Sequence, residues 1–361
     1  CVGFAMADSF EQLALFRFLL GFLADPARPA SAIGFITRAL AARRGSGGKA
    51  FTVLSCDNIP ENGKLLRGLV LELAAQIDPG LADWISAEGA FPSSMVDRIV
   101  PATTAEDIIT TTALTGFRDE APVMHEPFRQ WVVEDTFVGG LRPDLGAVGV
   151  ELVSDVTPYE HMKLRCLNGT HSSLAYIGYL AGAETISEAV SRPALAAYAK
   201  HLWQNEIIPV LSPPPGADLG QYADALFARY ANTGIQHRTW QIAMDGSQKL
   251  PQRLLGTISE NLAAGRVPSG LILAVAGWIQ YTSGHGLDSA AIDVRDPLAE
   301  RLAACWAESA SGTVASYLAL RQVFSPALAG NAVFVAALVE ALETLQARGA
   351  EASAAEVAAI G

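Results

Sequence analysis

The spacing of apolar residues changes near residue 150. Before this point, short apolar runs alternate with polar loops and amphipathic segments, in the order typical of an α/β domain. Beyond it, apolar residues recur at helical spacing over long segments. We therefore predict an α/β domain over residues 1–150 and an all-helical domain over residues 151–361. A chain of 361 residues is long enough for two domains.

The α/β domain is predicted from a strand–loop–helix pattern. The run "AFTVLSC" has the apolar and β-branched residues of a buried strand, and the turn-rich "DNIPENG" leads from it into a helix at "KLLRGLVLELAAQI". The first 45 residues predict two more helices, the second of them capped by Ser31. Three segments are expected to be strands: 50–56, 95–101 and 130–137. The long segments with helical spacing are 162–182, 187–207, 219–231, 252–265 and 333–360.

Composition excludes several kinds of partner. The chain has 25 Lys and Arg against 37 Asp and Glu and no basic stripe, so nucleic acid is not an expected ligand. Its longest apolar stretches are too short or too interrupted by charge to span a membrane, and acidic residues stand where a signal peptide carries positive charge. The four scattered cysteines are typical of reduced thiols. We expect a cytoplasmic protein, present as a monomer or homodimer.

Several common catalytic motifs are missing. The segment "RRGSGGKAF" contains Gly-Lys, but an arginine stands at the first glycine of the phosphate-binding motif and an alanine at its Ser/Thr position. The sequence has no GxGxxG, no HExxH and no GxSxG. A nucleotide-phosphate loop, a histidine-based metal site and a serine hydrolase site are therefore not predicted.

Three polar side chains interrupt an apolar helical segment in the middle of the chain: Lys163, Asn168 and His171. On an α-helix, Asn168 would lie about 140° around the axis from Lys163 and His171 about 80°, so all three fit within one broad face. Two interpretations are open. Either Lys163 extends to solvent while the other two are satisfied polar groups of the core, or the three line a site with a desolvated lysine as general acid or base.

A second polar pair, Asp57 and Asn58, directly follows the predicted strand 50–56. It could form an Asx turn that caps the next helix. Alternatively, the amide of Asn58 faces a ligand at the carboxyl end of a strand, which is where α/β folds collect their ligands.

Five long motifs follow one another along the chain: "FTVLSCDNIPENG", "FPSSMVDRIVPATT", "EPFRQWVVEDTF", "MKLRCLNGTHSSLAYIGYLAG" and "HRTWQIAMDGSQKLPQRLL". In sequence and order they resemble motifs of the polyol-specific long-chain dehydrogenases, the mannitol 2-dehydrogenase family, which also contains hexuronate reductases. The resemblance extends from about residue 30 to near the end of the chain. The resemblance implies a Rossmann-type domain followed by a helical substrate domain. It also implies a metal-independent, NAD-linked oxidoreductase that interconverts a sugar acid or polyol and its ketose.

The resemblance also implies roles for individual residues. Lys163, Asn168 and His171 match the catalytic K-x4-N-x2-H pattern of the family, and Asn58 matches an asparagine upstream of it. Lys163 would be the general acid and base, and its pKa would have to be lowered from about 10.4 toward neutrality by burial. Asn58, which also contributes to the cofactor site, and Asn168 would donate hydrogen bonds to the developing oxyanion. His171 would orient the lysine and the substrate hydroxyls.

Two further residues match positions near the substrate: Asp97 in "MVDRI" and Lys249 in "MDGSQK". The family's glycine-rich segment "GxGxFxRAHQ", which holds the NAD pyrophosphate, has no match. We therefore expect the chain to begin inside the cofactor domain, to contain the C-terminal part of the Rossmann-type domain, and to hold only part of the NAD site. Two alternatives stay open: oxidation of a neutral hexitol, and an inactive remnant that binds no cofactor.

Overall fold

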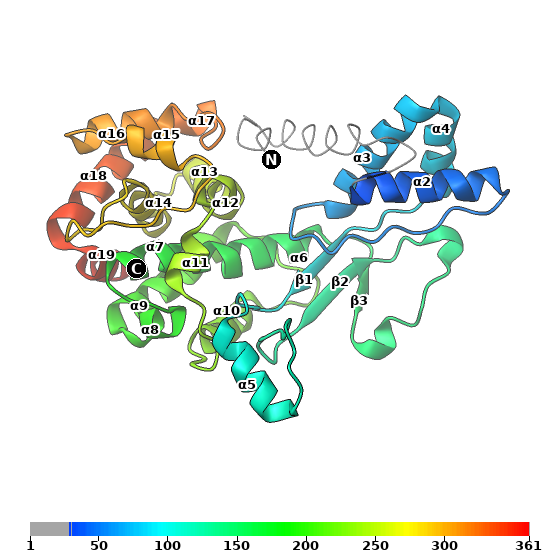
Figure 1. Cartoon of the computed structure of the whole chain (residues 1–361). Coiled ribbons are helices and arrows are strands. Elements are labelled where there is room, and N and C mark those ends of the chain that lie inside the picture. The colour runs from blue at the N-terminus through cyan, green and yellow to red at the C-terminus, as the bar shows by residue number, and fades with distance from the viewer. Residues whose placement is uncertain (1–28, 30, 361) are drawn as a thin grey trace. The chain divides into compact units, whose positions relative to one another are not determined.

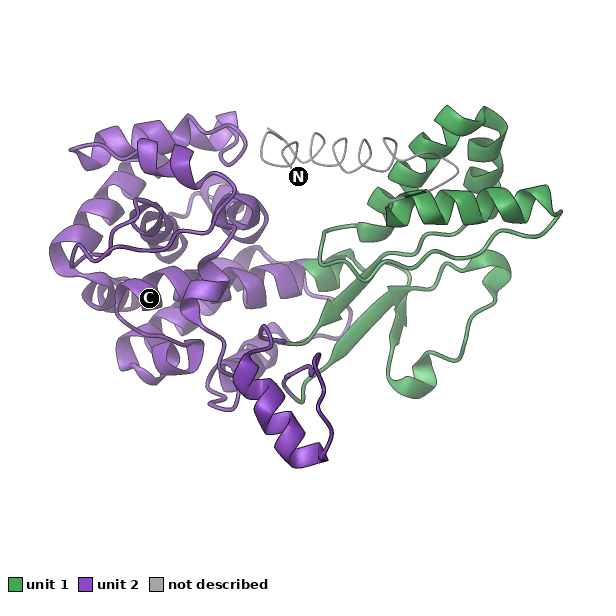
Figure 2. Ribbon diagram, in the orientation of Figure 1, with its two compact units in different colours: residues 1–98, 127–160 green, residues 99–126, 161–361 purple. Residues whose placement is uncertain are grey.

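The computed structural model describes residue 29 and residues 31–360, and the chain divides into two compact units (Figures 1 and 2). Of the described residues, unit 1 contains 29, 31–98 and 127–160, and unit 2 contains 99–126 and 161–360. Unit 1 combines a sheet with helices, whereas unit 2 is built from helices. The first of the two helices predicted within residues 1–45 lies outside the described residues.

The sheet of unit 1 has three strands in the order β1-β2-β3. Strand β1 (Ser94–Asp97) pairs antiparallel with β2 (Gln130–Glu134), and β2 pairs parallel with β3 (Glu151–Val153). Met95, Val132 and Val156 form a small buried cluster on this sheet. Two of the predicted strands are therefore present, each shorter than expected.

The predicted strand 50–56 is wrong as a regular strand. Its backbone is extended, but its ladder in the described part of the chain is a single parallel bridge between Thr52 and Ala90, where the amide of Val53 donates to the carbonyl of Ala90 over 2.9 Å. A strand needs a partner with a continuous row of backbone hydrogen bonds, and one bridge does not provide it.

Three helices complete the core of unit 1: α2 (Ala32–Gly45), α3 (Asn62–Ile77) and α4 (Pro79–Glu88). Ser31 caps α2 as predicted, because its Oγ accepts from the amide of Gly34 over 3.2 Å. Leu40, Val70 and Ile85, one from each helix, pack in a common buried cluster. Two short 3₁₀ turns, η2 (Val138–Gly140) and η3 (Gly146–Val148), lie between β2 and β3.

Helix α6 (Thr157–Met162) leads the chain from unit 1 into unit 2. The elements of unit 2 are α5 (Ala105–Thr115), η4 (Lys163–Gly169), α7 (Thr170–Leu180), α8 (Ile186–Ser191), α9 (Pro193–His201), η5 (Leu202–Ile207), η6 (Ile208–Val210), α10 (Leu219–Tyr230), α11 (Thr239–Ala243), α12 (Gly246–Leu250), η7 (Pro251–Leu255), α13 (Gly256–Ala263), α14 (Ser269–Thr282), α15 (Ala299–Ala304), α16 (Ala310–Leu318), α17 (Pro326–Ala329), α18 (Ala332–Arg348) and α19 (Ala350–Ala358). Three of them, η4, η5 and η7, are π-helical.

Helix α14 is the centre of unit 2. Every residue of this helix after Ser269 is buried, as expected for a helix that is apolar on all sides. It packs against α7 and α18. At Gly277 a methyl group would lie 2.7 Å from the Cδ1 atom of Ile177, so glycine permits the close approach of α14 and α7. The helical part of the fold prediction is therefore confirmed.

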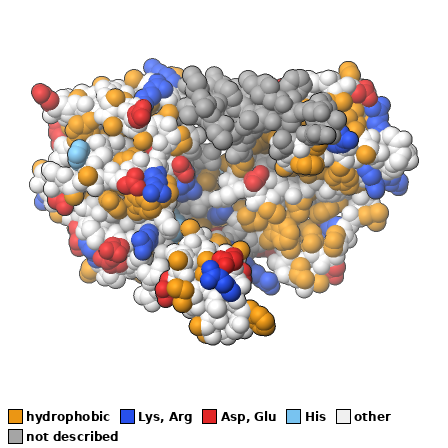
Figure 3. All heavy atoms as spheres, in the orientation of Figure 1, with side chains coloured by type: hydrophobic (Ala, Val, Ile, Leu, Met, Phe, Trp, Pro, Cys, Tyr) orange, Lys and Arg blue, Asp and Glu red, His pale blue; other side chains and the backbone are white. Residues whose placement is uncertain are grey.

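The surface carries mixed charge. On the face shown in Figure 3, acidic and basic side chains are interspersed, and hydrophobic side chains gather where unit 1 lies. Leu141 and Val148, between β2 and β3, are among the most exposed large hydrophobic residues of the described chain. None of the described helices is long and apolar enough to cross a bilayer.

Candidate active site

Lys163, Asn168 and His171 lie along one continuous helical rod made of α6, η4 and α7. The part that carries Lys163 and Asn168 is a π-helix, in which backbone hydrogen bonds join residues five apart. Side chains five positions apart therefore come to nearly the same face. The angle of about 140° expected for these two residues from α-helical geometry is thus wrong, and the wider turn brings them closer together. His171 follows Asn168 at a spacing of three, which is that of neighbours on a helix surface.

Two aromatic side chains from other helices support the π-helical turn. The indole Nε1 of Trp203 donates to the carbonyl oxygen of Cys166 over 2.9 Å. The hydroxyl of Tyr230 donates to the carbonyl oxygen of Leu167 over 2.6 Å. A buried carbonyl group without a partner costs about 1–3 kcal/mol. These hydrogen bonds therefore stabilise η4 in a geometry that an isolated helix would not retain.

The three predicted catalytic side chains are buried. Lys163 is 7% exposed, Asn168 8% and His171 7%. A lysine that extended to solvent would be far more exposed, so this interpretation of Lys163 is wrong. The Nδ2 atom of Asn168 is buried and has no hydrogen-bond partner among the described residues. Asn168 is thus not a satisfied amide of the core, and an unpaired buried donor is what an oxygen of a ligand would meet.

His171 is held by aromatic contacts. Its ring stacks on Tyr230, with centroids 5.2 Å apart and an interplanar angle of 18°, and meets the ring of His237 edge-on at 4.7 Å. Burial, followed by the nearby His237, Arg253 and other cations, holds the pKa of His171 well below its usual value. Burial and the charges of Lys249 and Arg253 lower the pKa of His237 to about 4. Both imidazoles are therefore neutral at pH 7.

Lys249 and Arg253 bring two cations to the same place. Burial, with repulsion from Arg253, lowers the pKa of Lys249 to about 8, and burial also lowers the pKa of Arg253. The Lys249 ammonium donates to the carbonyl oxygen of Met244 over 2.6 Å, and Arg253 Nη1 donates to Ser172 Oγ over 3.0 Å. The structure thus places the predicted residue Lys249 in the surroundings of His171.

Sequence reasoning missed Arg253 and His237. Arg253 follows Lys249 by four residues, the spacing that puts two side chains on one face of a helix, and this was a signal in the sequence. His237 is the first residue of the motif "HRTWQIAMDGSQKLPQRLL" and lies just before α11, but no role was assigned to it from the resemblance.

The remaining two predicted site residues, Asn58 and Asp97, belong to unit 1. Asn58 is exposed in the loop after the extended segment, and Asp97 is buried, at 3% exposure, at the end of β1. The alternative in which this loop caps the next helix is wrong. The residue before α3 is Glu61, in a left-handed conformation, and no side chain caps the helix there.

The loop that carries Asn58 is fixed by Asn62. The amide of Asn62 donates to the carbonyl oxygens of Asp57 and Ser94, both over 2.9 Å, and its oxygen accepts from the amide of Ser94 over 2.9 Å. Asn62 is itself buried, so these bonds join the loop firmly to β1. Sequence reasoning missed this residue, which acts on Asn58 and Asp97 through the backbone of the loop and the strand.

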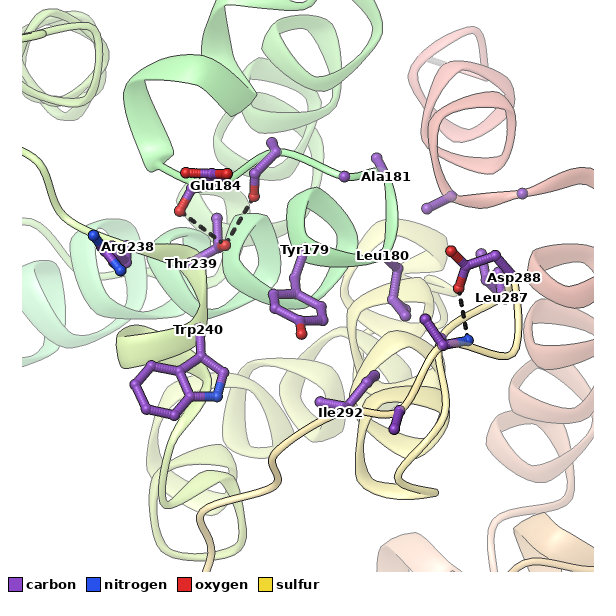
Figure 4. Close-up of a pocket in the computed structure, with 17 residues that line it drawn as sticks. Tyr179, Leu180, Ala181, Glu184, Arg238, Thr239, Trp240, Leu287, Asp288 and Ile292 are labelled. Atoms are coloured by element: carbon purple, nitrogen blue, oxygen red, sulfur yellow. Dashed lines mark hydrogen bonds between the residues drawn. The ribbon is translucent and has the colours of Figure 1, made fainter.

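A cavity of about 680 Å³ lies elsewhere in unit 2 (Figure 4). Tyr179, Trp240, Asp288 and Ile292 are among its lining residues, and none of the six predicted site residues is. Tyr179 stands eight residues after His171 on the same helix, which corresponds to about 12 Å along the axis. Its lining also includes Arg238 and Thr239, which directly follow His237 in the sequence. Over the described part of the chain, no group of three or more metal-binding side chains is present.

The sequence matches two family profiles. Residues 5–146 match the profile described as the mannitol dehydrogenase Rossmann domain, and residues 155–346 match the mannitol dehydrogenase C-terminal domain. The chain belongs to the mannitol dehydrogenase family. Its predicted fold class, a Rossmann-type domain followed by a helical domain, is thereby confirmed, as is the prediction of an oxidoreductase that acts on CH–OH groups.

Named members of this family cover most of the chain. D-mannonate oxidoreductase of Escherichia coli is 49% identical over 91% of this chain and 68% of its own length, and mannitol 2-dehydrogenase of Cereibacter sphaeroides is 40% identical over 91% and 68%. The structure of Pseudomonas fluorescens mannitol 2-dehydrogenase in complex with NAD and D-mannitol matches 98% of this chain and 72% of that one, with 36% identity and a TM-score of 0.87. A D-sorbitol dehydrogenase matches 94% of the chain with a TM-score of 0.80.

Proposed function

We propose that this protein interconverts D-mannonate and D-fructuronate with NAD, and that Lys163 is the general acid and base. The observation that carries the proposal is the buried π-helical turn, which joins Lys163 to an amide that has no partner in the described structure. The similarity to a D-mannonate oxidoreductase supports the choice of substrate. We also propose the domain limits 1–150 and 151–361.

The proton transfer is assigned to Lys163. In the oxidation, the neutral amine of Lys163 takes the proton of the substrate hydroxyl while the carbon loses a hydride, and in the reduction the ammonium returns the proton to the forming alkoxide. Asn168 and Asn58 donate hydrogen bonds to the oxygen on which negative charge develops, each a contact of about 3 kcal/mol in the transition state. His171, neutral and stacked on Tyr230, orients the substrate hydroxyls.

NAD, when bound, accepts or supplies the hydride. In the described structure, the loop over residues 56–58 is exposed at the carboxyl end of the extended segment that bridges to Ala90, the position at which α/β folds hold a dinucleotide. We assign Asn58 to the nicotinamide end of that site. Asp97 is assigned to a position near the substrate, and Lys249 to the substrate hydroxyls or carboxylate.

A neutral polyol is the second candidate substrate, because the structural neighbour from Pseudomonas fluorescens was solved with D-mannitol. The test is to measure NADH formation by the full chain with D-mannonate and with D-mannitol at equal concentration. Faster turnover of D-mannonate supports the proposal. Turnover of D-mannitol alone would assign the chain to the polyol branch, and absence of NADH formation with either substrate would favour an inactive protein.

A further inference from the structure

Arg253 lies against the helical rod of α6, η4 and α7, which carries Lys163, Asn168 and His171. It is part of η7, and a methyl group at Gly169 in η4 would lie 2.8 Å from the carbonyl oxygen of Arg253, so the two π-helices are in close contact. The guanidinium donates one hydrogen bond, to Ser172, the residue after His171. An arginine has five N–H donors, so most of its donor capacity is left for other partners.

The charge of Arg253 has no counter-ion in the described part of the chain. No Asp or Glu lies within ion-pair distance of it there, and the same holds for Lys249. Other arginines shielded from solvent differ in this respect. Arg229 makes two bonds to Glu126, of 3.0 and 2.7 Å, and Arg165 makes two to Glu260, of 2.5 and 2.7 Å.

Two partly buried cations therefore lie close together, and no carboxylate forms an ion pair with either of them in the described part of the chain. Asp245 and Asp296 act on Lys249 only from beyond ion-pair distance. Such an arrangement is costly for the folded protein, because burial disfavours each charge and the charges repel each other. Burial and repulsion from Arg253 lower the pKa of Lys249, and burial lowers the pKa of Arg253. A bound anion would remove the cost, so the site is better suited to an anionic than to a neutral ligand.

Other polar groups without a partner lie on the same elements or beside them. The Nδ2 atom of Asn168 and the Nδ1 atom of His237 are buried without a partner among the described residues. His237 touches His171, which is three residues from Asn168. A ligand rich in oxygen atoms, such as a hydroxylated acid, could satisfy these groups together with the two cations.

We propose that Arg253, with Lys249 beside it, binds the carboxylate of the substrate and thereby selects sugar acids over neutral polyols. Guanidinium binds carboxylate through two parallel hydrogen bonds, a geometry that an ammonium cannot reproduce. This inference rests on the proposed function, and it assigns the choice between its two candidate substrates to one side chain.

The test is calorimetric titration of the full chain with D-mannonate and with D-mannitol, in the presence of NADH, with which neither alcohol can be oxidised. Arg253→Gln should weaken D-mannonate binding by at least about tenfold and change D-mannitol binding little, because only the acid loses a charge-assisted contact. Arg253→Lys should give an intermediate loss for D-mannonate. Arg301→Gln, which removes an exposed positive charge on α15, is the matched control and should leave both affinities unchanged.

Equal losses for both ligands, or no loss for D-mannonate, would overturn the inference. If Arg253→Gln does not fold, as thermal unfolding would reveal, Arg253→Lys decides alone: an unchanged D-mannonate affinity overturns it. A wild-type chain that oxidises D-mannonate while Arg253→Gln binds it normally contradicts only the role of Arg253. A wild-type chain that oxidises D-mannitol but not D-mannonate contradicts the proposed function as well.

Discussion

The unpaired amide of Asn168 separates a functional role from a structural one. A buried donor that makes no hydrogen bond contributes nothing favourable to folding, and its removal leaves no other group unsatisfied. A donor that meets the developing oxyanion, by contrast, acts only in the transition state. The two roles therefore predict different effects of the same substitution.

Asn168→Ala should lower kcat by about 10²–10³-fold, the loss typical of one oxyanion donor. The free energy of unfolding should change little, because no folded-state hydrogen bond is lost. Turnover with D-mannonate and urea unfolding are the two measurements. A large loss of stability with normal turnover would show that Asn168 is a structural residue.

His237, whose ring contacts that of His171, predicts an effect of pH on the stability of the fold. Above pH 6.5, His237 is neutral in the folded and the unfolded protein. As the pH falls from 6.5 toward 4, the unfolded chain binds a proton at this residue and the folded chain does not, because its pKa is about 4. The free energy of unfolding should therefore decrease by about 1.4 kcal/mol per pH unit in this window.

His237→Gln should remove this contribution. Urea unfolding at pH 7, 6 and 5 should give a shallower decrease for the variant than for the wild type. Glu160, whose pKa burial raises to about 7, has the opposite effect, since the stability it contributes is lost as the pH rises from 4.5 toward 7. It is present in both proteins and cancels in the comparison. Parallel profiles would contradict the lowered pKa of His237.

At the scale of elements, the π-helical turn η4 is the feature that the sequence did not reveal. The apolar spacing around Lys163 correctly predicted a helix, but periodicity does not distinguish a π-turn from an α-turn over seven residues. The turn depends on partners distant in the sequence, Trp203 and Tyr230. The prediction of a regular strand over residues 50–56 was wrong for a related reason. Its β-branched residues predict an extended backbone, but they do not predict which strand pairs with it.

Tyr230→Phe tests the support of this turn. The substitution leaves the carbonyl of Leu167 without the hydroxyl that donates to it, so we expect a loss of about 1–3 kcal/mol in the free energy of unfolding. Turnover should also fall, because η4 positions Lys163. Tyr281→Phe is the matched control: its hydroxyl is buried without a partner among the described residues, so its removal should leave both quantities unchanged. Equal behaviour of the two variants would mean that Tyr230 does not hold the turn.

For the molecule as a whole, the sequence predicted a sheet-containing part and a helical part. Short apolar runs that alternate with amphipathic segments are typical of a core between a sheet and helices, whereas long segments of helical spacing are typical of a core between helices. The family motifs predicted four residues of the candidate site that lie in the helical unit: Lys163, Asn168, His171 and Lys249. Arg253 and His237 were not predicted, because their role depends on which helices pack together, and Asn62 acts through backbone atoms.

Chelation tests the chemistry of the whole site. Exhaustive dialysis against a chelator should leave turnover unchanged, because proton transfer by lysine and hydrogen bonds from amides replace polarisation by a metal. The measurement is NADH formation before and after dialysis. Activity that is lost on chelation and restored by zinc would contradict the proposed mechanism.

The central proposal is that Lys163 transfers the proton, and Lys163→Ala tests it most directly. NADH formation from D-mannonate should fall by about 10²–10⁴-fold, the usual contribution of a positioned acid or base. NADH binding, followed by fluorescence, should be retained, and Lys200→Ala, which removes an exposed lysine of α9, should be fully active. A small primary amine added to Lys163→Ala should restore part of the turnover. Near-normal turnover of Lys163→Ala would contradict the assignment.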